Sequence, residues 1–171
     1  MNETLNTLKT RRSVRAFTDK PVGDDALDLI LEAGLFAPTG KNSQTPVMVA
    51  VRDPETIAYM SKLNAQVLGA DYDPFFGAPC VVVVLADPVR DTWIEDGSLV
   101  MGNMMNAAHS LGIASCWIHR ARQVYDSPEG KALLRKWGVP EHLRGIGNCL
   151  LGYAADVPAT KPRAEGRIFK K

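Results

Sequence analysis

Three arginines and a serine lie within five positions near the N-terminus, in the order Arg11, Arg12, Ser13, Val14, Arg15. Guanidinium groups are rigid, forked donors that match a phosphate or a carboxylate, and three of them this close repel one another unless solvent or an anion neutralises them. The cluster therefore has the chemistry of an anion clamp. A second basic cluster near the other end of the chain consists of Lys161, Pro162 and Arg163.

The alternative to an anion clamp is a solvated basic patch. The N-terminal segment alone favours these two interpretations equally. A nucleic-acid partner is not favoured, because 20 Lys and Arg are balanced by 19 Asp and Glu and the net charge is only +1. A nucleic-acid-binding face would need a broader excess of positive charge. The charge is local, which favours a small anion.

The length and composition predict one domain over residues 1–171. A chain of 171 residues with 46% hydrophobic content can bury a proper core. Residues 1–9 lack an apolar signal region, and the longest apolar run, residues 81–86, is too short to cross a bilayer. We therefore expect a soluble, cytoplasmic protein that has no membrane partner.

The cysteines and histidines do not form a recognisable ligand pattern. The cysteines lie in apolar runs without CxxC spacing, which predicts buried, reduced thiols, and they are Cys80, Cys116 and Cys149. The histidines lack the spacing of metal ligands, and they are His109, His119 and His142. We expect no metal site.

Helical and strand patterns alternate along the chain. Helices are expected at residues 3–9, from Asp24, from Pro54 after the capping Asp53, over residues 94–111 and from Pro128 after the capping Ser127. Strands are expected at residues 47–51, 80–86, 113–118 and 148–153. The helix over residues 94–111 mixes glycines and alanines with methionines, a pattern that favours core packing and a subunit interface equally.

The common nucleotide-binding and hydrolase fingerprints are missing. Gly145 and Gly147 lack the third glycine of GxGxxG, and Lys41 is not followed by the Ser or Thr of a Walker loop. There is no GxSxG elbow, and no Cys, His and acid motif supports covalent catalysis. Because the chain has few acid or base groups of its own, we expect a cofactor to carry the chemistry.

Five motifs in order together resemble the FMN-dependent nitroreductase family, and they span nearly the whole chain. They are RRSVRAF followed by PV at residues 11–22, APTGKNSQ at 37–44, LGIASCWI at 111–118, LGY at 151–153 and KPR at 161–163. The resemblance implies an α+β fold with a mainly antiparallel central sheet flanked by helices. Periodicity alone did not exclude a parallel sheet.

The resemblance also implies an intertwined homodimer with two flavins at its interface, in which the C-terminal segments embrace the partner subunit. It would place the small-residue helix in the dimer core. Carried over position by position, Arg11, Ser13 and Arg163 resemble the clamp for the FMN phosphate, with Arg12 and Lys161 in support.

The remaining cofactor contacts are likewise implied by the resemblance. Arg15 would lie beside the N1 and C2 carbonyl edge of the isoalloxazine and tune it, whereas no side chain is expected to be catalytic. The loop that reaches the flavin of the other subunit would use Pro38, Thr39 and Asn42. Asn64 would read the pyrimidine edge, and the main chain near His119, next to Ile118 and Arg120, would donate to flavin N5.

The implied activity is a ping-pong reaction. NADH or NADPH delivers hydride to N5, and an electron-poor small molecule, such as a nitroaromatic or a quinone, then collects two electrons. One alternative is a specialised biosynthetic or dehalogenating flavoenzyme of the same fold. Another is a flavin-binding module that is not an enzyme.

Two departures from the family pattern affect these expectations. The family commonly shows Gln-Pro-Trp where this chain has Gln44, Thr45 and Pro46, so the entry to the following strand could be shifted. The chain is also short for the family, and residues 72–76 or Trp93 are then the candidates to cover the flavin.

Overall fold

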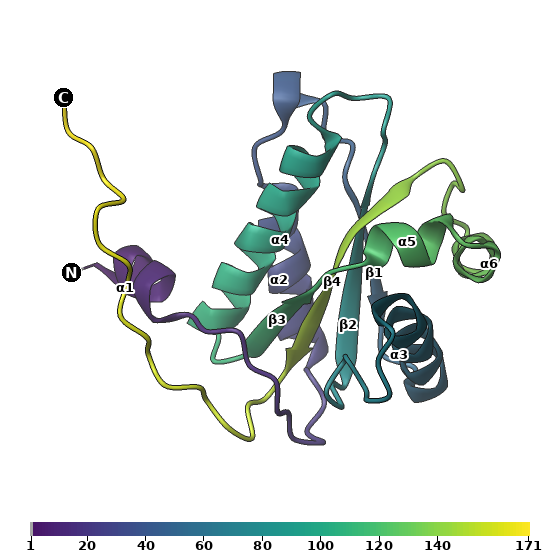
Figure 1. The fold of residues 1–171 in the computed structure, drawn as a ribbon, viewed down its shortest axis with the longest axis horizontal. Helices are drawn as coiled ribbons and strands as arrows, with labels where there is room; N and C mark the ends of the chain where they lie inside the picture. The colour runs from purple at the N-terminus through teal and green to yellow at the C-terminus, as the bar shows by residue number, and fades with distance from the viewer. Residues whose placement is uncertain (1) are drawn as a thin grey trace.

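A four-stranded antiparallel sheet forms the centre of the computed structural model, which describes residues 2–171 (Figure 1). The strands lie in the order β1-β2-β4-β3. Their bounds are β1 Val47–Val51, β2 Cys80–Ala86, β3 Ala114–Ile118 and β4 Arg144–Gly152. Each neighbouring pair is antiparallel, which confirms the antiparallel sheet that the family resemblance implied.

Helices cover both faces of this sheet, and β2 is buried throughout. Val81, Val83 and Leu85 pack into one core cluster, beneath α3 (Pro54–Leu68), α5 (Ala121–Asp126) and α6 (Pro128–Lys136). Val82 and Val84 pack into a second cluster, against α2 (Asp24–Leu35) and α4 (Trp93–Ser110). Successive strand residues point to opposite faces, so a continuous apolar run can serve two cores.

The helix starts follow the predicted caps. Asp53 accepts a hydrogen bond from the Thr56 amide, and Ser127 accepts one from the Gly130 amide. A proline occupies the first turn of each helix, where the missing N–H costs nothing. The predicted starts of α2, α3 and α6 and the whole of β1 and β2 are confirmed.

Two elements differ from the expectation. β4 begins at Arg144 rather than at residue 148, and α5 was not predicted. Gly145 and Gly147 lie inside β4, where added Cβ atoms would come within 2.4 Å of the Ala121 backbone and 2.6 Å of the Trp117 ring. These glycines permit close packing, so their strand lacks the side chains that mark a strand in the sequence.

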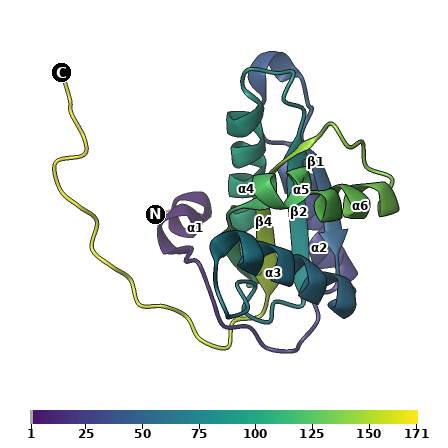
Figure 2. The ribbon, with the colours of Figure 1, turned by 45° about the vertical axis from the view of Figure 1, so that its right-hand side comes forward.

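The two ends of the chain extend from the same side of the sheet domain (Figure 2). α1 (Glu3–Thr10) buries none of its residues, and residues 155–171 are all exposed. Ile168 and Phe169 keep 82% and 80% of their surface accessible. Among residues 2–171, no helix is both long and apolar enough to cross a membrane.

The cysteines are free and buried, as predicted. Burial raises the pKa of the Cys80 thiol to about 11, and it also raises the pKa of Cys149. A thiol that stays protonated in an apolar core is a poor nucleophile.

Candidate functional site

The arginine-rich segment runs along the edge of the sheet. Ser13 forms a parallel bridge with Ser115 of β3, and the Val14 amide donates to the Ser115 carbonyl at 3.1 Å. Val14 itself is buried and anchors the segment. Beside this bridge lies a cleft of about 220 Å³, whose lining includes Thr10, Arg11, Arg12, His109 and Ser115.

Arg11 has the strongest sign of an absent ligand. Its Nη1 atom is buried, yet it finds no hydrogen-bond partner among residues 2–171. Ser115 also lines this cleft, and its hydroxyl is buried without a partner among the described residues. Buried polar groups are nearly always paired, and a buried cation without a partner is the more costly case. These groups fit a bound anion such as a phosphate.

Arg12 differs from Arg11, because its N–H groups already donate hydrogen bonds to other residues of the chain. Nη1 donates to the carbonyls of Lys9 and Arg11 at 2.9 and 2.8 Å, and Nη2 donates to the Thr160 hydroxyl at 2.7 Å. Arg12 therefore holds the C-terminal segment against the N-terminal one. Lys161 directly follows Thr160, and both Lys161 and Arg163 are exposed.

His109 lies at the end of α4, and its pKa reflects the charges around the cleft. Its Nε2 lies 2.8 Å from the Thr10 hydroxyl. Burial lowers the pKa of His109, and the nearby positive charges of Arg11 and Arg12 lower it further. The cleft thus disfavours an added positive charge and would favour a negative one.

Ser13 and Arg15 approach β3 at Cys116. Burial raises the pKa of the Cys116 thiol, but Arg15, a hydrogen bond from Ser13 and Arg11 act in the opposite direction. The Arg15 side chain is exposed. The structure therefore brings Arg11, Ser13 and Arg15 together along one strand.

The turn after β3 is held by Asn64 of α3. The Asn64 amide nitrogen donates to the His119 carbonyl at 2.9 Å, and its oxygen accepts from Arg120 Nε at 3.2 Å. Arg120 has a φ of 72°, which is uncommon for a residue with a side chain. Asn64 is fully buried, and Ile118 ends the strand. The side chain of Asn64 thus fixes the main chain at His119.

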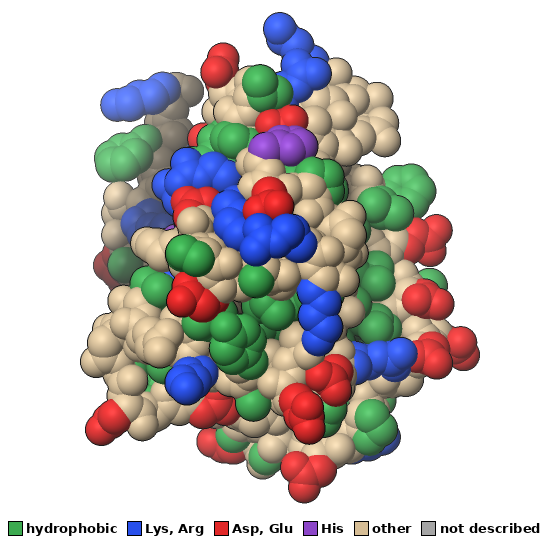
Figure 3. All heavy atoms as spheres, turned by 90° about the vertical axis from the view of Figure 1, so that its right-hand side faces the viewer, with side chains coloured by type: hydrophobic (Ala, Val, Ile, Leu, Met, Phe, Trp, Pro, Cys, Tyr) green, Lys and Arg blue, Asp and Glu red, His purple; other side chains and the backbone are tan. Residues whose placement is uncertain are grey.

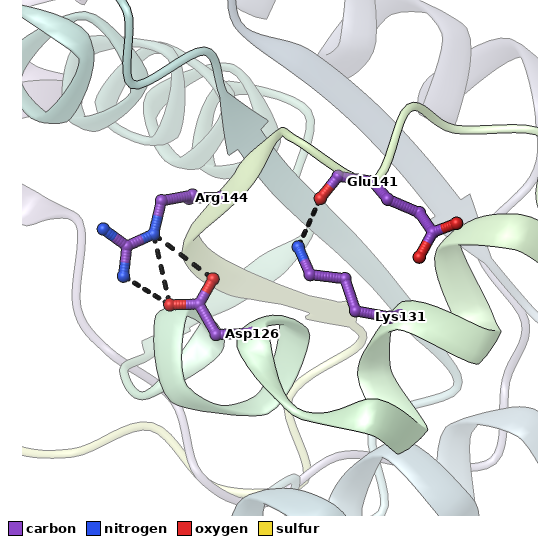
Figure 4. Close-up of polar contacts among 4 residues, drawn as sticks. All are labelled: Asp126, Lys131, Glu141 and Arg144. Carbon is purple, nitrogen blue, oxygen red and sulfur yellow. Dashed lines mark hydrogen bonds and ion pairs between the residues drawn. The ribbon is translucent and has the colours of Figure 1, made fainter.

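An ion pair and a hydrogen bond fix the helices that follow this turn (Figure 4). Arg144, at the start of β4, donates through Nε and Nη2 to Asp126 at the end of α5. Lys131 of α6 donates to the Glu141 carbonyl. Basic and acidic side chains lie next to one another on this face of the molecule (Figure 3). These contacts stabilise the fold. With its mixed charges, this face is not a broad basic surface.

The loop that contains Pro38, Thr39 and Asn42 lies elsewhere. It includes the short 3-10 turn η1 (Gly40–Asn42), and it meets the first turns of α4, whereas the cleft lies at the end of α4. α4 has 18 residues, which corresponds to about 27 Å. Within one chain, this loop therefore lies too far away to reach Arg11 and Ser13.

The two candidate covers lie outside the cleft. The Trp93 ring has the guanidinium groups of Arg122 and Arg144 at 4.8 and 5.6 Å from its centroid. Tyr72 stacks on Phe76 at 6.4 Å, and Tyr72 lines a separate apolar groove of about 740 Å³ beside α3. The described residues hold no cluster of His, Cys, Asp or Glu that could bind a metal ion.

Three residues of the site were not identified from the sequence. Ser115 and His109 come to the cleft through a strand bridge and a helix end, and Asp96 contacts the distant loop. All three depend on contacts between residues far apart in the chain. No local spacing could have indicated them.

With this geometry described, similarity to known proteins defines the class. The model of the Nitroreductase family matches residues 8–71 and 65–153, and the chain belongs to this family. A protein of Archaeoglobus fulgidus, provisionally named an NADH dehydrogenase/NAD(P)H nitroreductase, is 35% identical over 91% of this chain and 88% of its own length.

Solved structures agree with this assignment. A Bacteroides fragilis nitroreductase with bound FMN is 33% identical, covers 100% of both chains and superposes with a TM-score of 0.93. A Desulfitobacterium hafniense nitroreductase with bound FMN is 27% identical over 100% of this chain and 99% of its own, with a TM-score of 0.90.

Proposed function

We propose that this protein is an FMN-dependent NAD(P)H oxidoreductase that reduces nitroaromatic or quinone-type acceptors. The observation that carries the proposal is the buried, unpaired Nη1 of Arg11 in a positive cleft. It occurs in a chain that matches a nitroreductase with bound FMN over its full length. A phosphate at this cleft would satisfy the unpaired group.

In the proposed site, Arg11 and Ser13 hold the phosphate of FMN. Lys161 and Arg163 join them from the C-terminal segment, which Arg12 holds through Thr160. A charge-assisted hydrogen bond contributes about 1.5 to 3 kcal/mol, so each one would raise the affinity for FMN by about tenfold or more.

The clamp and the main chain at His119, at the two ends of β3, would together hold the flavin. When bound, FMN accepts a hydride from NADH or NADPH and passes two electrons to the acceptor. Arg15 would stabilise the negative charge that the ring gains at its N1 and C2 carbonyl edge. The main chain at His119 would hold the flavin near N5. Asn64, which the family resemblance placed at the pyrimidine edge, is fully buried and its amide already bonds His119 and Arg120, so it would act by fixing this main chain.

No side chain is assigned as a catalytic acid. Protons can come from solvent, and the protein supplies position and charge. This agrees with the residues that line the cleft, among which His109, with its lowered pKa, is the one side chain that titrates near neutral pH. The role of Arg15 is testable, because Arg15→Ala should lower the midpoint potential of the bound flavin while Arg15→Lys retains most of it.

We further propose a homodimer in which residues 38–42 of one subunit complete the flavin site of the other. The length of α4 between this loop and the clamp supports it, since one chain cannot bring the two together. The exposed apolar side chains of Leu5, Leu8 and Phe169 also support it, because a partner surface would bury them. The free thiols are consistent with a cytoplasmic location.

Steady-state kinetics test the proposed reaction. Under anaerobic conditions, FMN-loaded protein should oxidise more than one equivalent of NADH or NADPH only when a nitroaromatic or quinone acceptor is present. Double-reciprocal plots at several acceptor concentrations should be parallel, as a ping-pong reaction requires. Converging lines would exclude that mechanism, and the absence of turnover with both donors would leave a flavin-binding protein that is not an enzyme.

A further inference from the structure

We infer that Asp96 is a positioning residue, whose buried carboxylate holds residues 38–44 of its own chain in the shape that completes the flavin site of the partner subunit. The inference rests on the proposed function above, and it assigns a role to a residue that neither binds FMN nor lies in the cleft. It explains how a short, irregular loop is kept ready at a subunit interface.

The Asp96 carboxylate is almost fully enclosed, with 2% of the residue accessible. Oδ1 accepts a hydrogen bond from the Gly40 amide at 2.8 Å, and Oδ2 accepts one from the Thr92 hydroxyl at 3.1 Å. No salt bridge to Asp96 forms among residues 2–171. A buried carboxylate depends on such donors, so the contact with Gly40 is important to both groups.

The loop adopts a conformation that its own residues disfavour. Lys41, Asn42 and Gln44 have φ values of 53°, 54° and 49°, in the left-handed region. Residues with a side chain rarely adopt this region, and they remain there only when the surroundings impose it. Three such residues within four positions indicate a loop whose shape is set from outside.

Few contacts can impose that shape. Within the loop, the Gln44 amide donates to the Thr39 hydroxyl at 3.0 Å, and the Gln44 side chain donates to Asn42 at 3.1 Å. Over residues 2–171, the bond from Gly40 to Asp96 is the one hydrogen bond that links residues 38–44 to another element. Asp96 is therefore the point at which α4 holds the loop.

Close packing at Gly40 supports the same assignment. A Cβ atom added to Gly40 would lie 2.3 Å from the Thr92 hydroxyl oxygen. The loop backbone thus touches the start of α4, where only glycine fits without displacement. The hydrogen bond to Asp96 and the packing against Thr92, the N-cap of α4, both locate the loop at the start of this helix.

The test combines amide hydrogen exchange with FMN binding, using Asp96→Ala, Asp96→Asn and the control Glu95→Ala. In Asp96→Ala, exchange at Gly40 and in residues 41–44 should accelerate by about tenfold or more, and the Kd for FMN should rise by a similar factor. Asp96→Asn keeps an acceptor oxygen and should restore both properties. Glu95→Ala removes an exposed acid from the same turn and should behave as the wild type.

The outcomes separate this inference from the proposed function. If the wild type does not bind FMN, the flavin proposal fails, whereas exchange at Gly40 still reports on the loop. If the wild type binds FMN and Asp96→Ala keeps both its affinity and its exchange rates, the inference is overturned. Gly40→Ala leaves α4 intact and should reproduce both effects of Asp96→Ala. Should Asp96→Ala not fold, tight FMN binding by Gly40→Ala would overturn the inference.

Discussion

At the scale of single residues, one short segment contains arginines with different environments. Residue types predicted an anion clamp, and only the family resemblance separated Arg11 from Arg12. Among residues 2–171, Nη1 of Arg11 is buried and unpaired, whereas the donors of Arg12 bind backbone carbonyls and Thr160. That difference depends on the position of residue 160, far along the chain. Residue types therefore predicted the chemistry, and tertiary contacts decided which guanidinium is available.

The Arg11 assignment predicts a ligand-specific loss. Arg11→Ala should weaken FMN binding by about 1.5 to 3 kcal/mol, because it removes a charge-assisted bond to the phosphate. Riboflavin lacks the phosphate, so its affinity should change little. Titration of the protein freed of flavin with both compounds measures the difference. Equal losses for the two would indicate that Arg11 supports the fold rather than the phosphate.

His109 predicts a pH dependence of stability. Its pKa lies below the ordinary 6.5 in the folded protein, so the unfolded chain binds the proton more readily near that pH. The stabilising contribution is therefore present above about pH 6.5 and is lost as the pH falls below it. The Tm of the protein without FMN should drop between about pH 7.5 and 5.5, and the drop should be smaller in His109→Gln. An equal reduction in His142→Gln, which changes an exposed histidine, would contradict this assignment.

At the scale of elements, the sequence predicted the helix starts that depend on local caps. It did not predict the features that depend on packing between elements. The caps at Asp53 and Ser127 are local, and the helices began where the sequence predicted. β4 was predicted too short because Gly145 and Gly147 lack the side chains that mark a strand in the sequence. Glycine is needed at these two positions because α5 and Trp117 approach the strand closely, and no local sequence pattern indicates such contacts.

The β4 glycines predict unequal costs of substitution. In Gly145→Ala the new methyl group would meet the Ala121 backbone, which cannot move without shifting α5. In Gly147→Ala it would meet the Trp117 ring and the Met101 side chain, which can adjust in part. We expect about 2 to 3 kcal/mol of destabilisation for Gly145→Ala and a smaller loss for Gly147→Ala. Denaturant unfolding measures both, and the reverse order would contradict the packing argument.

At the scale of the whole molecule, the chain alone holds two separate halves of the proposed site. The clamp lies at the end of α4, and the loop of residues 38–44 lies at its start. The family resemblance implied that the loop of one subunit completes the site of the other. Residue spacing alone did not indicate that the site is divided. Exposed apolar side chains on α1 and near the C-terminus are consistent with a second copy.

A mixed dimer tests the division. Arg11→Ala should impair the clamp, and the double variant Thr39→Ala with Asn42→Ala should impair the loop. A dimer that combines one chain of each type, isolated with two different tags, contains one site in which both halves are intact. It should bind one FMN tightly, whereas each variant homodimer binds FMN weakly. If the mixed dimer binds FMN as weakly as the two variant homodimers, the clamp and loop act within one subunit.

The most direct measurement of the central claim is anaerobic reduction of the FMN-loaded protein by a single equivalent of NADH or NADPH. The account predicts a yellow protein that releases FMN on denaturation, loses its visible flavin absorbance on mixing, and regains it when a nitroaromatic or quinone is added. A protein that remains colourless after incubation with FMN, or a bound flavin that neither nicotinamide reduces, would contradict it.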